Sequence, residues 1–238
     1  MQTVIDFHSH VLPGIDDGSS SLEESIALLR QLRKQGIGRV VATPHFYPNY
    51  DNPEHFLRKR DEAEQLLRAE MAKHDDLPEL HIGAEVYFFR GLSDSEYLRP
   101  LCIRGTDCIL IEMMSSPWPE AVYTELEKIS RRGITPIIAH IDRYIAPFKT
   151  HGIPKRLAEL PVLVQANADF FLESHTQRMA MKMLKNDQIH LLGSDCHNMS
   201  TRPPELGYAL RHIERRLGAD VLCRVGDYGR SVLFSAEE

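Results

Sequence analysis

Short apolar segments alternate with amphipathic segments along most of the chain. Seven of the apolar segments are rich in valine and isoleucine, and near-continuous apolar runs are typical of strands that are covered on both faces of a parallel sheet. The predicted strands are Thr3–Phe7, Gly38–Thr43, Leu80–Glu85, Cys108–Glu112, Thr135–His140, Val162–Asn167 and Ile189–Asp195.

The amphipathic segments predict helices between these strands. The first helix begins after Ser21, which stands three residues before Glu24 as in a capping box, and it ends at Gly36. The other predicted helices are Pro53–Lys73, Pro119–Arg132, Thr176–Asn186 and Pro204–Leu217. Regular alternation of strands and helices favours right-handed crossovers, and therefore an α/β fold with a closed or nearly closed parallel barrel.

Length and charge narrow the class of protein. A chain of 238 residues suits a single barrel domain, because α/β barrels occupy ~200–250 residues. The net charge is -6 and basic residues are spread along the chain, so we expect no nucleic-acid partner. We find no signal-peptide pattern and no apolar run of ~20 residues, so we expect no membrane insertion and a cytoplasmic location. The oligomeric state stays open.

Ionisable residues stand at or just beyond the carboxyl end of most predicted strands. In a parallel barrel these ends form one rim, where the active sites of such folds lie. His8 and His10 are two residues apart, so both project from the same face of a strand, as two imidazoles that share a metal must. The candidate metal ligands are one acid of the pair Asp16 and Asp17, which follows the first strand, together with His8, His10, His45, Glu85, Glu112, His140, Asp195 and His197.

As a set, these nine residues predict a cluster of metal ions. Any one of them alone would more often be a hydrogen-bonded structural group, but several carboxylates brought together disfavour their mutual ionisation unless cations intervene. Imidazoles and carboxylates without thiolates suit Mn, Fe or Zn. Nine ligands suit two or three ions, and three divalent ions against four carboxylates leave a surplus of two positive charges, which a phosphate dianion would balance.

Two arginines follow candidate ligands closely. Arg143 stands three residues after His140, and Arg202 stands five residues after His197. Guanidinium groups on these loops could each bind two phosphate oxygens. We therefore predict Arg143 and Arg202 as catalytic residues that contact a substrate phosphate.

The chain resembles the polymerase-and-histidinol-phosphatase (PHP) superfamily, and within it the bacterial capsular and exopolysaccharide tyrosine-protein phosphatases. The resemblance rests on D-x-H-x-H followed by LPGIDDG, then ATPH, GAE, IEM, IAHIDR and SDCHN…RPP, in this order from Asp6 to about Pro204. It implies one PHP metallophosphatase domain over residues 1–238, folded as a distorted (β/α)7 TIM-like barrel with three divalent metal ions. Manganese is the expected metal, with iron or zinc as alternatives.

The resemblance also implies how the ligands are divided. His8, His10, Glu85 and Asp195 would hold the first ion. Glu85 would bridge to a second ion, which Glu112 and His140 complete. The third ion would take Asp17, His45 and His197, while Asp16 is expected to be a structural partner.

The implied reaction is hydrolysis of phosphotyrosine by direct attack of activated water, with no phosphoenzyme and with Arg143 and Arg202 stabilising the developing charge. The implied substrate is the tyrosine-rich tail of a bacterial tyrosine autokinase that controls polysaccharide export. IAHIDR has Ile-Asp where many relatives have Pro-Glu, and QANADFF lacks the serines expected after the sixth strand. Both departures concern substrate fit more than metal binding.

Four other functions fit parts of the sequence. Cys196 and Arg202 match C-x5-R of cysteine-dependent tyrosine phosphatases, but the loop has no glycine, Pro203 follows the arginine, and Asp195 would raise the thiol pKa. An amidohydrolase would also begin with His-x-His but would not explain Glu112 and His197. Histidinol-phosphate phosphatase is the main alternative, and a scaffold that binds a phosphorylated partner without hydrolysis is the non-enzymatic one.

Overall fold

The computed structural model describes residues 4–115, 117–145 and 152–234. Its strands are β1 (Asp6–Ser9), β2 (Arg39–Ala42), β3 (His45–Phe46), β4 (Glu79–Ile82), β5 (Glu85–Tyr87), β6 (Cys108–Glu112), β7 (Thr135–Ile138), β8 (Leu163–Asn167) and β9 (Leu191–Gly193). Its helices are α1 (Leu22–Lys34), α2 (Pro53–Met71), η1 (Leu92–Asp94), α3 (Glu120–Arg131), α4 (Asp142–Ile145), α5 (Gly152–Leu157), α6 (Ala168–Leu172), α7 (Gln177–Lys185), α8 (Leu206–Leu217) and α9 (Ala219–Phe234). Thr3, the first residue of the predicted strand Thr3–Phe7, lies outside the described residues.

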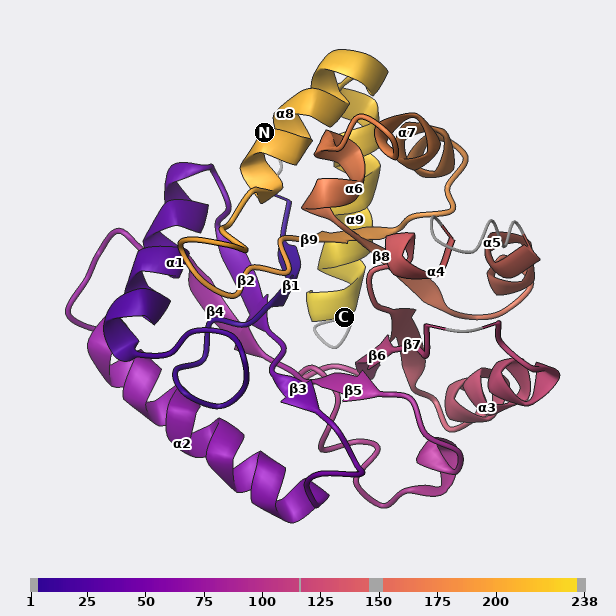
Figure 1. Cartoon of the computed structure of the whole chain (residues 1–238), viewed down its shortest axis with the longest axis horizontal. Helices are drawn as coiled ribbons and strands as arrows, with labels where there is room; N and C mark the ends of the chain where they lie inside the picture. Colours follow the sequence, from indigo (N-terminus) through magenta and orange to yellow (C-terminus); the bar gives the residue numbers. More distant parts are fainter. Residues whose placement is uncertain (1–3, 116, 146–151, 235–238) are drawn as a thin grey trace.

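All of the strand pairs are parallel, and the strands curl around a common centre (Figure 1). Hydrogen bonding divides them into a sheet of order β1-β2-β4 and a sheet of order β3-β5-β6-β7-β8-β9. The two sheets meet beside β1, where the Asp195 N–H donates to the His8 carbonyl at 2.8 Å and Ser9 bridges Cys196. The predicted α/β fold with a curled parallel sheet is therefore confirmed.

One predicted strand is divided in the structure, and one short strand was not predicted. The predicted strand Leu80–Glu85 is divided into β4 and β5, and the chain after β2 resumes as the two-residue strand β3. Pro44 stands between β2 and β3, where it has no N–H to donate to a neighbouring strand. These breaks matter for the site, because His45 begins β3 and Glu85 begins β5, and the two are register partners.

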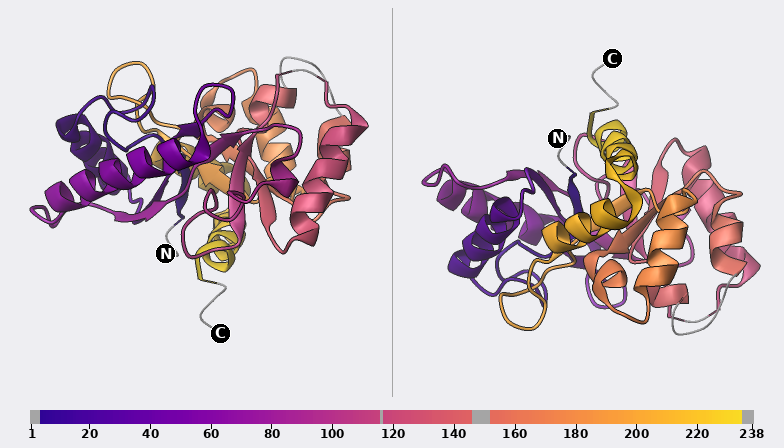
Figure 2. Two further views of the ribbon diagram at one scale, coloured as in Figure 1. Left: turned by 90° about the horizontal axis from the view of Figure 1, so that it is seen from below. Right: turned by 90° about the horizontal axis from the view of Figure 1, so that it is seen from above.

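The inside of the curled sheet holds its own apolar cluster. Phe7 of β1, Leu110 of β6 and Ile137 of β7 pack there against Val232 and Leu233 of α9. A Cβ on Gly229 of α9 would come within 3.0 Å of the Phe7 ring, so the glycine permits this close approach. Figure 2 (left) shows that α9 extends from one side of the strands, while the loop near residue 200 lies on the opposite side. The sequence pattern did not predict α9.

The remaining helices cover the outer face of the strands and form the larger core. Leu28, Leu29 and Leu32 of α1 are fully buried, as the predicted amphipathic stripe requires. Ser21 caps α1 by accepting a hydrogen bond from the Glu24 N–H, which confirms that part of the predicted capping box. Within the described ranges, no helix is both long enough and apolar enough to cross a membrane.

Candidate metal centre

The nine candidate ligands lie at the carboxyl ends of the strands, on neighbouring elements. They come from β1 and the loop after it, from the first residues of β3 and β5, from the end of β6, and from the segments after β7 and β9. His140 and Asp195 have positive φ angles of 30° and 51°. Residues other than glycine rarely adopt this backbone conformation. Such strain is stored most often at functional sites.

A glycine next to Asp195 lets two strands approach closely. A Cβ on Gly193 would lie 2.5 Å from the His8 Cβ and 2.7 Å from Gln165 Nε2. A larger side chain would therefore push β9 away from β1, and Asp195 with it. Gly193 thus sets the distance at which Asp195 meets the imidazoles of β1.

The first group of candidate ligands lies around the imidazoles of His8 and His10. His8 Nε2 lies 3.1 Å from Glu85 Oε2 and 3.5 Å from Asp195 Oδ1. His10 Nε2 lies 3.3 Å and 3.4 Å from the same two oxygens. Ligand atoms ~2.1 Å from a tetrahedral ion stand about 3.4 Å apart. His8, His10 and Glu85 are therefore close enough to one another to share an ion. Asp195 Oδ1 lies within 3.5 Å of both imidazoles.

A second group surrounds the other side of Glu85. Glu85 Oε1 lies 2.7 Å from His140 Nε2, which is 3.7 Å from Glu112 Oε1. The structure adds His45 to this group, because its Nδ1 lies 2.9 Å from Glu85 Oε2 and 3.9 Å from Glu112 Oε2. Glu85 thus has one carboxylate oxygen beside His140 and the other beside the first group, as a bridging ligand would.

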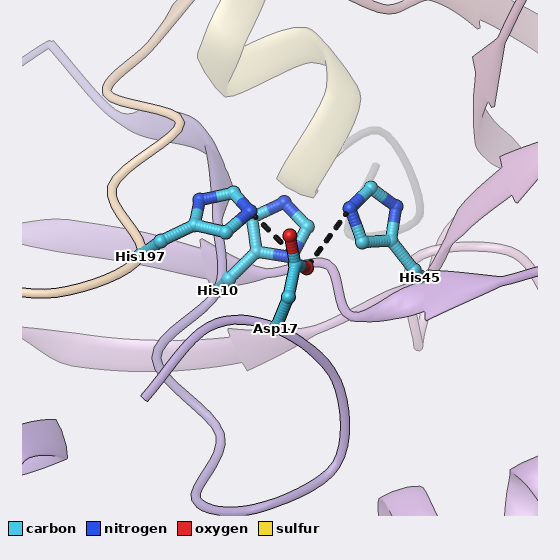
Figure 3. A group of neighbouring side chains, drawn as sticks. All are labelled: His10, Asp17, His45 and His197. Atoms are coloured by element: carbon cyan, nitrogen blue, oxygen red, sulfur yellow. Dashed lines mark ion pairs between the residues drawn. The ribbon is translucent and has the colours of Figure 1, made fainter. Parts of the chain in front are cut away.

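A third group forms where the loop after β1 folds back over the rim (Figure 3). Asp17 Oδ1 lies 3.4 Å from His45 Nε2 and 3.5 Å from His197 Nε2. His10 also belongs here, since its ring centroid is 3.9 Å from that of His197. The structure therefore brings together the three residues predicted for the third ion and places His10 between the first and third groups.

Four buried polar atoms of these groups have no hydrogen-bond partner: His45 Nδ1, Glu85 Oε2, Glu112 Oε2 and His197 Nε2. His45 Nδ1 and Glu85 Oε2 approach to 2.9 Å without the alignment of a hydrogen bond. Unsatisfied buried groups are rare in folded proteins because each costs the free energy of its lost hydration. Divalent cations would satisfy these atoms, so the donor set fits a cluster of metal ions.

In four of the five imidazoles, Nδ1 has a hydrogen-bond partner on the side of the ring away from the cluster. His8 Nδ1 lies 3.3 Å from Gln165 Oε1, and His10 Nδ1 lies 2.7 Å from Asp16 Oδ2. His140 Nδ1 lies 3.0 Å from Tyr144 Oη, and His197 Nδ1 lies 3.0 Å from the carbonyl of Asp195. Such partners leave Nε2 directed at the cluster, as the outer contacts of metal-binding histidines do.

Gln165 and Tyr144 were not predicted as site residues. Gln165 is a fully buried polar residue in the middle of β8, between Val164 and Ala166, and this break in an apolar strand was a detectable signal. Its Oε1 also accepts from the His140 N–H at 2.6 Å. Tyr144 gave no such signal, because an aromatic residue in a short helix is ordinary. Asp16, expected as a structural partner, accepts from the His45 N–H at 3.0 Å as well as facing His10.

The charges at the centre depend on one another. Burial opposes ionisation of Glu85 and Asp195, yet the nearby His8 and His10 outweigh it and hold the pKa of both carboxyl groups well below the usual range. Burial and the charge of Glu85 raise the pKa of Glu112. Burial and the neighbouring His10 lower the pKa of His197 to about 4. The centre is thus a dense group of ionised carboxylates and imidazoles, in which bound cations would replace the protons that His8 and His10 hold.

The two predicted arginines both contact the carboxylate of Asp195. Arg143 Nη2 and Arg202 Nη2 lie 2.6 Å and 2.8 Å from Asp195 Oδ2, and Asn167 Nδ2 donates to the same oxygen at 2.8 Å. Both arginine side chains are more than a third exposed. A cavity of about 260 Å³ opens beside them, and its lining includes the acidic residues Asp142, Asp169, Glu173 and Glu205.

Cys196 is poorly placed to act as a nucleophile. Its side chain is fully buried, and burial together with the charge of Asp6 raises the pKa of its thiol to about 12. A cysteine-dependent phosphatase needs a thiolate with a lowered pKa that reaches the substrate. The structure therefore argues against the C-x5-R interpretation of Cys196 and Arg202.

Residues 4–226 match the family "Capsular polysaccharide synthesis, CpsB/CapC". The chain belongs to this family. The tyrosine-protein phosphatase CpsB of Streptococcus pneumoniae is 32% identical over 231 residues, which are 91% of this chain and 92% of the relative. The tyrosine-protein phosphatase YwqE of Bacillus subtilis is 27% identical over 225 residues, or 92% of this chain and 87% of the relative.

A solved structure supports the same CpsB/CapC assignment at the level of the fold. A chain from the crystal structures of YwqE and of S. pneumoniae CpsB, described as metal-dependent tyrosine phosphatases, has a TM-score of 0.86 with this protein. The sequence identity is 23%, and the match covers 97% of this chain and 94% of the other. The predicted family and its barrel fold are therefore confirmed.

Proposed function

We propose that this CpsB/CapC protein is a metal-dependent protein-tyrosine phosphatase. The observation that carries the proposal is the position of Asp195, whose Oδ1 faces the imidazoles of His8 and His10 while its Oδ2 faces Arg143 and Arg202. A metal cluster and a phosphate-binding arginine pair would thus act on the same small volume. The names of the similar proteins support the same activity. The family description adds the setting of capsular polysaccharide synthesis.

The cofactor we propose is a set of three divalent ions, Mn2+ first, with iron or zinc as alternatives. His8, His10, Glu85 and Asp195 would hold one ion. Glu85, Glu112 and His140 would hold another, and Asp17, His45 and His197 the third, with His45 Nδ1 and His10 near enough to contribute to neighbouring ions. Bound ions would supply an activated water at neutral pH and neutralise the charge of the phosphate.

The residues of the chain would supply orientation and charge. Arg143 and Arg202 would exchange part of their contact with Asp195 for the phosphate oxygens, where their fork-shaped guanidinium groups stabilise the charge that develops during displacement. Asn167 would keep Asp195 Oδ2 hydrogen-bonded while this exchange occurs. The leaving phenolate of phosphotyrosine has a pKa near ~10, well below that of an alkoxide, so departure would not demand a strong general acid.

We extend the proposal to substrate, location and domain organisation. The substrate would be a phosphotyrosine protein, and within capsule synthesis it would be the tail of a bacterial tyrosine autokinase. The enzyme would work in the cytoplasm as a single PHP metallophosphatase domain over residues 1–238. This last point is supported by ligands that come from both ends of the chain and by a family match that covers residues 4–226.

Phosphate release by the purified protein tests the proposal. The protein is stripped of metal by a chelator and reloaded with Mn2+, and turnover of a phosphotyrosine peptide is compared with turnover of histidinol phosphate. We expect hydrolysis of the peptide only after metal is restored. Preference for histidinol phosphate would favour the alternative of a histidinol-phosphate phosphatase, and absence of turnover with every metal would favour the phosphoprotein-binding scaffold.

A further inference from the structure

Three tyrosines stand at the rim beside the candidate metal centre. The ring of Tyr47 stacks on the imidazole of His45, with centroids 4.9 Å apart and planes 28° apart. Tyr87 approaches Tyr47 at 5.6 Å, and Tyr50 meets it edge-on at 6.4 Å. We refer to Tyr47, Tyr50 and Tyr87 as the aryl wall. It leads from a candidate metal ligand outward to solvent, because Tyr50 is 91% exposed.

The aryl wall is not explained by core packing. Tyr47 and Tyr87 are partly exposed, and none of the three described tyrosines belongs to the two apolar clusters that form the core. Burial and the nearby carboxylate of Glu112 raise the pKa of the Tyr47 hydroxyl. The ring therefore stacks on one candidate metal ligand, His45, and its hydroxyl is near a second, Glu112.

We propose that the aryl wall binds the phenyl ring of phosphotyrosine and makes the site prefer aryl over alkyl phosphomonoesters. This inference rests on the proposed function. In phosphotyrosine the ring is separated from phosphorus by one ester oxygen, so a phosphate at the metal centre leaves its ring at the rim. Aromatic pairs in offset or edge-to-face contact gain free energy beyond the area that they bury.

The cavity beside Arg143 and Arg202 has a different chemistry from the aryl wall. The cavity of about 260 Å³ beside Arg143 and Arg202 is lined largely by polar groups, among them five carboxylates. A phenyl ring gains little there, because it would displace water from charged groups without replacing their hydrogen bonds. The partly exposed rings on the His45 side therefore offer the better contact for an aryl leaving group.

Competitive binding of two phosphonates tests the inference. Phenylphosphonate carries a phenyl ring on phosphorus where methylphosphonate carries a methyl group. The dissociation constants of both are measured by calorimetry on the Mn2+-loaded protein. We expect Tyr47→Leu at saturating Mn2+ to weaken phenylphosphonate by about 2- to 10-fold and to change methylphosphonate less than about 2-fold. Tyr47→Phe keeps the ring and should keep the preference. Tyr87→Leu, in strand β5, should weaken the binding of phenylphosphonate to a smaller extent.

A matched control is Tyr208→Leu, which removes an exposed tyrosine from α8. The inference is overturned if Tyr47→Leu leaves the preference for phenylphosphonate unchanged, or if it weakens both phosphonates equally. Because calorimetry needs no turnover, these outcomes are separate from failure of the proposed function, which would appear as absence of phosphotyrosine hydrolysis by the wild-type protein.

With an active protein, the same variants are compared on a phosphotyrosine peptide and a phosphoserine peptide of otherwise identical sequence. Tyr47→Leu should lower kcat/KM for the phosphotyrosine peptide by about 2- to 10-fold and leave the phosphoserine value unchanged. Metal content is measured for each variant. An equal fall for both peptides with full metal content would contradict a role in recognising the ring.

Discussion

Arg143 Nη2 lies 2.6 Å from Asp195 Oδ2, while the other oxygen of the same carboxylate lies 3.5 Å from His8 Nε2. Asp195 thus divides its two oxygens between a cation of the chain and the place proposed for a metal ion. Because Arg143 is 38% exposed, its guanidinium can also reach a ligand in the adjacent cavity. Asp195, which would hold a metal ion, therefore also positions Arg143 for the substrate.

Arg143→Ala should lower kcat by ~10²- to 10³-fold, because it removes a donor that stabilises charge in the transition state. Arg143→Lys should recover only part of the activity, since an ammonium group cannot make the two parallel hydrogen bonds of a guanidinium. Phosphate release and metal content are measured together. Arg39→Ala, which breaks a surface pair with Glu79, is the matched control. Loss of metal in proportion to loss of activity would show that Arg143 acts on the cluster instead.

Tyr144→Phe should weaken metal binding without removing any proposed ligand. The Tyr144 hydroxyl contacts His140 Nδ1 at 3.0 Å and accepts from the Met113 N–H at 2.8 Å. Loss of such an outer contact typically costs 10- to 100-fold in metal affinity. Activity titrated against Mn2+ should shift to higher concentration and recover at saturation. Tyr228→Phe, which removes a surface contact to Asp187, should not shift the titration.

Cys196→Ser should retain most of the activity. The thiol is fully buried and its pKa is raised to about 12, first by burial and then by the charge of Asp6, so almost no thiolate exists near neutral pH. The measurement is phosphotyrosine turnover at saturating Mn2+, with the exposed Cys223→Ser as control. If Cys196→Ser lost nearly all turnover while its metals remained bound, the metal mechanism would be wrong.

Stability of the metal-free and metal-loaded protein should respond to pH in opposite directions. Burial opposes protonation of His8 and His10, but Glu85 and Asp195 outweigh it for His8, and Asp16 does so for His10, which raises both pKa values above 6.5. Above pH 6.5 the folded metal-free protein therefore holds protons that the unfolded chain has released. Its stability falls as pH rises through the raised pKa values.

Metal binding requires neutral imidazoles, so the affinity for metal rises over the same interval. Between pH 6.5 and 8, the Tm of the chelated protein should decrease, and the increase in Tm on adding Mn2+ should grow. Thermal unfolding in matched buffers measures both. The lowered pKa of His197, about 4, acts below this window and does not interfere. A metal-induced shift in Tm that shrank with increasing pH would contradict the proposed imidazole ligands.

The sequence predicted the order of strands and helices well where apolar runs were long and unbroken. β6 spans the predicted Cys108–Glu112, and α3 and α7 lie within one residue of the predicted ends. The break between β4 and β5 was missed, because an apolar run does not reveal where two strands stop pairing, and the two-residue strand β3 was not predicted. Helix α9 was missed as well, and its burial depends on contacts with β1 that are distant in sequence.

The sequence by itself determined which chemistry the protein can perform. Histidines and acids placed after successive apolar strands had to meet at one edge of a parallel sheet, since all strands of such a sheet point the same way. It could not determine how those ligands are shared. That His10 lies between two groups, that His45 presents both ring nitrogens to carboxylates, and that Gln165 supports the imidazole of His8 follow from side-chain directions set by packing across the whole barrel. Only the tertiary structure decides such contacts, because each joins residues whose separation along the chain carries no information about their distance in space.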